Sequence, residues 1–75
     1  MPSFKYQSPE QLQVEIKKLL LDESTSQRVL ADRLGIKPQG LTKLLNKKNF
    51  SFDDALKILS ALGYDLVIGF EKSAE

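Results

Sequence analysis

The feature that most constrains this chain is a short turn, Leu34-Gly35-Ile36-Lys37-Pro38, between two segments with helical patterns of apolar residues. Gly35 is expected to end the first helix, because glycine adopts the left-handed conformation that closes a helix without a steric penalty. Pro38 suits the first position of the second helix, where its missing N–H is no loss, and it pushes Lys37 out of the helical region. The sequence therefore predicts two short helices joined by a tight turn over residues 26–46.

Both predicted helices have an apolar face for burial and a polar face for solvent. Ser26 is placed to cap the first helix, and Ile36 is expected to fill the turn. The apolar positions are Val29, Leu30, Ala31 and Leu34 in the first helix and Leu41, Leu44 and Leu45 in the second. The polar face of the second helix carries Gln39, Thr42, Lys43 and Asn46, followed by Lys47 and Lys48. This combination is typical of a helix-turn-helix motif, whose second helix enters the major groove of DNA.

Composition limits the chain to a few classes of protein. Its 75 residues predict a single small domain, residues 1–75, and they include no cysteine and no histidine. The usual zinc sites and the Ser-His and Cys-His catalytic arrangements are therefore excluded, and we predict no catalytic residue, metal or cofactor. No apolar run approaches the roughly 20 residues that span a bilayer, so we expect a cytoplasmic protein without membrane contact.

The charge distribution is more informative than the net charge of +1. Residues 26–50 hold six basic residues and one acidic residue, a balance of +5, whereas the remainder holds five basic and nine acidic residues, a balance of −4. Positive charge is thus concentrated on the segment that would face DNA, as a phosphate-binding surface requires. The alternative interpretation of these lysines is an ordinary solvated helix face.

A helix before the motif is predicted over residues 9–22. Ser8 and Gln11 have the spacing of a capping box around Pro9, which suits the first helical position. Its core-facing side chains are expected to be Leu12, Ile16, Leu19 and Leu20.

Another helix is predicted to begin at Ser51 and to end at Gly63, with a broad apolar face. Asp53 and Asp54 lie in its first turn, where carboxylates complement the helix dipole, and we interpret them in this way rather than as catalytic groups.

Residues 65–71, near the end of the chain, have a strand-like rather than a helical composition. This apolar run predicts a β-strand with Leu66, Ile68 and Phe70 on one face. A lone strand needs a partner for its amides and its apolar face, which is either Phe4 to Tyr6 of the same chain or a second copy. We favour a strand shared across a homodimer, with those three side chains in the interface.

The residues from Ser26 to Tyr64 resemble the Cro/C1 (XRE) type of helix-turn-helix repressors. The resemblance is carried by Ser26-Gln27, Leu30-Ala31, Leu34-Gly35-Ile36, Leu41, Leu56, Ile58 and Leu62-Gly63. It implies a mainly α, lambda-repressor-like helical bundle. The two ends, Tyr6 to Leu12 and Leu62 to Ile68, are similar to HipB-type antitoxins, which share a C-terminal strand across the dimer.

The resemblance also implies roles for single residues. Gln39, Thr42 and Lys43 match positions that read base edges. Gln27 matches a residue that binds a DNA phosphate. Asn46, Lys47 and Lys48 match the end of the recognition helix and the following loop, which commonly contact the DNA backbone. Lys37, at the start of that helix, is assigned to phosphate as well.

Three positions depart from the family pattern. Leu45 stands where the family often has glutamate, and Lys47 stands where it often has glycine. Gly40 costs the second helix about 1 kcal/mol relative to alanine. It either lets the backbone approach DNA closely or is only tolerated.

The sequence thus predicts a dimeric, sequence-specific transcriptional repressor on a pseudo-palindromic double-stranded DNA operator. The similarity to HipB-type antitoxins implies an autoregulating antitoxin as one form of such a repressor. The alternative is a protein-interaction module that neutralises a partner toxin, with DNA binding secondary. That alternative predicts an exposed apolar patch around Val14 and Leu21.

Overall fold

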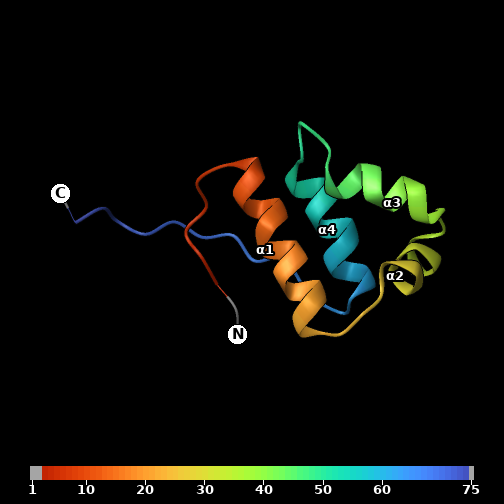
Figure 1. Ribbon diagram of the computed structural model, residues 1–75. Coiled ribbons are helices and arrows are strands. Elements are labelled where there is room, and N and C mark those ends of the chain that lie inside the picture. The colour runs from red at the N-terminus through yellow and green to blue at the C-terminus, as the bar shows by residue number, and fades with distance from the viewer. Residues whose placement is uncertain (1–2, 75) are drawn as a thin grey trace.

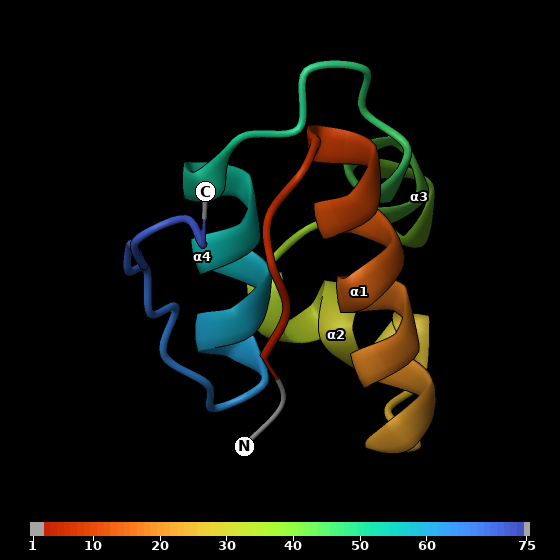
Figure 2. The same ribbon diagram turned by 90° about the vertical axis from the view of Figure 1, so that its left-hand side faces the viewer.

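The computed structural model describes residues 3–74, which form four helices. These are α1 (Pro9–Asp22), α2 (Gln27–Leu34), α3 (Pro38–Leu45) and α4 (Phe52–Ala61). In both views α1 and α4 run side by side, and α2 packs against both α3 and α4 (Figures 1 and 2). The helices predicted from the sequence are all present, so the mainly α helix-turn-helix fold is confirmed.

Serine caps begin three of the four helices. Ser8, Ser26 and Ser51 each accept a hydrogen bond from the amide three residues on, at 3.0 to 3.1 Å. The predicted capping box at the start of α1 is incomplete, because the Gln11 side chain accepts from the Gln7 amide at 2.6 Å instead of from Ser8. A complete box forms at Ser51 and Asp54 instead.

The turn between α2 and α3 has the predicted conformation. Gly35 has φ +71°, in the left-handed region, and the Ile36 amide donates to the Ala31 carbonyl at 3.0 Å. Lys37 is extended, with φ −78° and ψ 155°, and Pro38 begins α3. Local backbone preferences therefore set the path between these two helices.

The core lies between the four helices and is almost entirely apolar. It consists of Leu12, Ile16, Leu20, Leu30, Ala31, Leu41, Leu45, Phe50, Ala55, Ile58 and Leu59. Two residues that the sequence pattern placed inside are exposed, Val29 at 43% and Leu56 at 45%. Each lies about 100° around its helix from a fully buried neighbour, Leu30 or Ala55, and so faces partly away from the core.

The predicted C-terminal strand is absent from this chain. Between residues 3 and 74 no β-strand forms, and residues 65–71 run as extended backbone beyond the helices (Figure 1). Leu66 packs against the chain's own core, whereas Ile68 and Phe70 are 57% and 101% exposed. The three residues therefore do not share one free face, which corrects the sequence interpretation.

The N-terminal arm does not pair with the tail either. Lys5 and Glu71 form an ion pair at 3.1 Å, but no backbone hydrogen bond joins these two described segments. The Tyr6 ring packs instead against Phe52 at the start of α4, with ring centroids 5.0 Å apart.

None of the helices described between residues 3 and 74 is long and apolar enough to span a bilayer.

Candidate nucleic-acid interface

The polar face of α3 is presented to solvent by burial of the opposite face. Leu41 and Leu45 are 0% and 1% exposed and anchor the helix to the core. Gln39, Thr42, Lys43 and Asn46, one stripe at helical spacing, are all exposed. The structure therefore brings together the three residues predicted to read bases, on a helix whose position is fixed by its buried side.

Two side chains of this stripe are already engaged within α3. The Thr42 hydroxyl donates to the Pro38 carbonyl at 3.1 Å, and the Asn46 side-chain amide donates to the Thr42 carbonyl at 2.9 Å. A hydroxyl has one proton, so Thr42 can offer a base edge its methyl group and its lone pairs. Sequence reasoning did not reveal this restriction.

The residues predicted to hold phosphates come from separate elements. Gln27 is the first residue of α2, Lys37 precedes α3, and Lys48 lies in the loop before α4; all three are exposed. Lys37 and Lys48 flank α3 in the sequence, whereas Gln27 belongs to α2, which packs against α3. The predicted recognition helix therefore has a lysine near each end, and the fold adds the Gln27 amide from α2.

Lys47 is held by contacts on two sides. Its ammonium group lies 3.0 Å from the Asp54 carboxylate, and its carbonyl accepts a hydrogen bond from the Gln13 side chain at 2.7 Å. Part of the charge predicted to face DNA is therefore balanced within the protein. The loop after α3 is fixed by α1 on one side and by α4 on the other.

Asp54 is the buried polar residue on which this loop depends, with 7% exposure. One carboxylate oxygen accepts from both the Ser51 amide and the Lys47 ammonium group, at 3.0 Å each. The Ser51 hydrogen bond lowers the pKa of Asp54 although burial opposes it, and Lys47 lowers this pKa further. Its predicted role in the first turn of α4 is therefore joined by a second one, the anchoring of Lys47.

Helix α1 contributes two polar residues that the sequence analysis did not select. Besides the Gln13 contact, the Lys17 ammonium group donates to the Asn46 side-chain oxygen at 2.9 Å. Gln13 and Lys17 are four residues apart and so lie on one face of α1. Their spacing is visible in the sequence, but nothing local shows that this face of α1 meets the end of α3.

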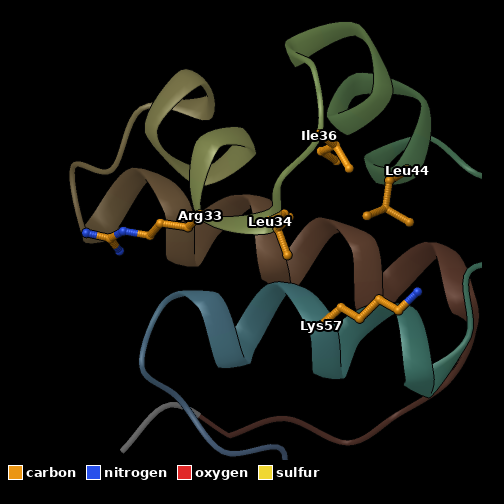
Figure 3. Close-up of a pocket in the computed structure, with 5 residues that line it drawn as sticks. All are labelled: Arg33, Leu34, Ile36, Leu44 and Lys57. Atoms are coloured by element: carbon orange, nitrogen blue, oxygen red, sulfur yellow. The ribbon is translucent and has the colours of Figure 1, made fainter.

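An open groove lies between the α2–α3 turn and α4 (Figure 3). It has a volume of about 360 Å³ and is lined by Arg33, Leu34, Ile36, Leu44 and Lys57. The Arg33 guanidinium donates to the Ala61 carbonyl at 3.2 Å and joins α2 to the end of α4. This contact gives Arg33 a structural role outside the predicted DNA surface.

The fold and the exposed face of α3 define the class of protein, a helix-turn-helix DNA-binding transcription regulator. The family model described as Helix-turn-helix matches residues 16–68. The chain belongs to this helix-turn-helix family, of the Cro/C1 (XRE) type. No curated protein and no solved structure matches the chain.

Proposed function

We propose that this protein is a sequence-specific transcriptional repressor that binds double-stranded DNA in the cytoplasm. The observation that carries the proposal is the exposed polar stripe of α3, presented by a helix-turn-helix with a fully buried opposite face. Repression and a cytoplasmic location are supported by the Cro/C1 membership, since they are the usual properties of this type.

Gln39, Thr42 and Lys43 are the proposed base-reading residues. A glutamine amide pairs with the N6 and N7 edge of adenine, and lysine suits the O6 and N7 acceptors of guanine. The Thr42 hydroxyl proton is used in the hydrogen bond to the Pro38 carbonyl. Thr42 therefore fits a thymine methyl group or an amino group of adenine or cytosine, and does not fit the acceptor edge of guanine.

Gln27, Lys37, Asn46, Lys47 and Lys48 are the proposed phosphate-binding residues. Flexible ammonium groups act as point charges, so these lysines contribute affinity that does not depend on sequence. Since Lys47 is ion-paired with Asp54, it is expected to contribute less to the salt dependence than Lys48, which has no ion pair in the described part of the chain.

The proposal is tested by in vitro selection from a random duplex library. Gln39→Ala or Thr42→Ala should cost roughly 1 to 3 kcal/mol at one base position and relax the preference there. Ser60→Ala, an exposed polar change on α4, is the matched control and should leave the recovered motif unchanged. An identical base-preference profile in all three variants would remove Gln39 and Thr42 from the readout.

The homodimer is the finer part of the proposal. Two copies would place their α3 helices in successive major grooves, about 34 Å apart, on a pseudo-palindromic operator. Support comes from Ile68 and Phe70, whose apolar side chains are exposed in the single chain, and from backbone in residues 65–71 that has no ladder partner there. A second copy supplies a partner for both.

One observation favours a second candidate function, an antitoxin that binds a toxin protein. Val14 and Leu21 of α1 are 48% and 80% exposed, as the alternative interpretation of the sequence requires. Co-purification with the product of a neighbouring gene, lost in a Val14→Ser, Leu21→Ser double variant, would establish this function. If that variant still binds the partner, the toxin contacts a surface other than the one around Val14 and Leu21.

A further inference from the structure

Lys17 lies between two residues that are proposed to bind phosphate but that belong to different helices. Its ammonium group is 2.9 Å from the side-chain oxygen of Asn46, at the end of α3. It also lines a shallow hollow of about 230 Å³ together with Gln27, at the start of α2. Lys17 thus stands where α1, α2 and α3 meet at the edge of the predicted DNA surface.

The charge of Lys17 is not balanced by an ion pair within residues 3–74. The ion pairs among residues 3–74 are Lys5–Glu71, Lys18–Glu15 and Lys47–Asp54, and Lys17 takes part in none of them. The neighbouring Lys18 differs in this respect, because its ammonium group is 3.4 Å from Glu15. Lys17 therefore supplies a full positive charge at this junction.

The geometry leaves Lys17 donors for a ligand. An ammonium group has three N–H donors, and Asn46 takes one of them. The Asn46 amide is itself fixed by its bond to the Thr42 carbonyl, so the position of the ammonium group is tied to the recognition helix. The hollow beside Lys17 is also lined by Leu20, Leu21 and Thr25.

We infer that Lys17 is the cation of a DNA phosphate-binding position formed with Gln27 and Asn46, which extends the interface onto α1. The occupant is a backbone phosphodiester of duplex DNA, and the inference rests on the proposed DNA-binding function. The hydrogen bond between Lys17 and Asn46 also couples this phosphate contact to the orientation of α3. Binding of the phosphate would therefore help to position the base-reading residues of that helix.

The test is the salt dependence of binding to the selected duplex and to an unrelated duplex, measured by fluorescence anisotropy. Lys17→Ala should lower the slope of log K against log salt by about 0.9, equally on both duplexes, because one phosphate contact is lost. Lys17→Arg keeps the charge and should retain the slope. Lys18→Ala removes an ion-paired charge from the next position of α1 and should leave the slope unchanged.

Lys17→Gln separates charge from polarity, because glutamine is neutral but keeps N–H donors at this position. The slope of log K against log salt should fall as much as in Lys17→Ala. The melting temperature followed by circular dichroism should stay near that of the parent protein. A slope retained in Lys17→Ala and Lys17→Gln would overturn the inference. So would an equal loss of slope in Lys18→Ala, which would indicate an effect of net charge alone.

The two proposals fail in different ways. If the parent protein selects a motif that depends on Gln39 and Lys17→Ala binds with an unchanged slope, only the inference about Lys17 is overturned. If the parent protein binds no duplex at any salt concentration, both are overturned.

Discussion

At the scale of single residues, Asp54 joins the stability of the fold to the shape of the DNA-binding surface. Its carboxylate completes the cap of α4 and holds Lys47 in the loop that follows α3. Both contacts favour the ionised form, which is why the pKa of Asp54 is lowered. Since this pKa is lower in the folded state, the contribution is complete above the unfolded-state pKa of about 3.9. It is lost as the pH falls through the folded-state pKa.

Asp54→Asn should therefore lower the free energy of unfolding at pH 7 by about 1 kcal/mol, because two charge-assisted hydrogen bonds become neutral ones or are lost. Urea unfolding at pH 7 and at pH 3 measures this effect, and the difference from the parent protein should narrow at the lower pH. Asp53→Asn removes an exposed charge from the same helical turn and so controls for the helix dipole. Equal losses in the two variants would show that the Asp54 contacts add nothing.

At the scale of elements, the two glycines of the helix-turn-helix have opposite energetic roles. Gly35 closes α2 at φ +71°, where a side chain is strained, so Gly35→Ala should destabilise the protein by about 1 to 2 kcal/mol. Gly40 lies inside α3, and a Cβ there would meet the Ile36 side chain at 3.8 Å, an ordinary contact. Gly40→Ala should stabilise the protein by about 1 kcal/mol through helix propensity.

Thermal unfolding distinguishes these outcomes, because about 1 kcal/mol shifts the melting temperature of a domain of this size by roughly 4 to 8 °C. A lower melting temperature for Gly40→Ala would contradict the contact geometry around Ile36. If the stabilised variant loses DNA affinity, Gly40 serves a close approach of the backbone to DNA; if affinity is kept, the glycine is only tolerated in α3.

At the scale of the whole molecule, the tail after α4 is the segment through which the proposed homodimer would form. An Ile68→Ser, Phe70→Ser double variant should dissociate the proposed homodimer, because the apolar area that a second copy covers is lost. It should also weaken binding to a full palindrome while single half-sites are bound as before. Val67→Ser is the matched control, an exposed apolar residue on the alternate side of the extended segment.

Sedimentation equilibrium at about tens of micromolar protein gives the mass of the parent and of both variants. A monomer mass for the parent protein would contradict the dimer directly. If the double variant is still a dimer, the interface lies outside residues 65–71.

Much of the fold was predicted from the sequence because its determinants are local. Gly35 and Pro38 fixed the turn, and the three serines fixed the starts of their helices, through bonds that span three residues. The strand was the main wrong prediction for the single chain. Its residues have the right composition, but strand pairing depends on a partner that residues 3–7 do not supply here.

The sequence by itself determined the helices, the turn and the polar stripe of α3, because backbone preference, capping and apolar periodicity act within one or two helical turns. Only the tertiary structure decided which residues from different elements meet. Lys17 reaches Asn46 across 29 positions of sequence, and Gln13 reaches Lys47 across 34. Such contacts follow from how α1 packs beside the rest of the core, and no local pattern encodes that placement.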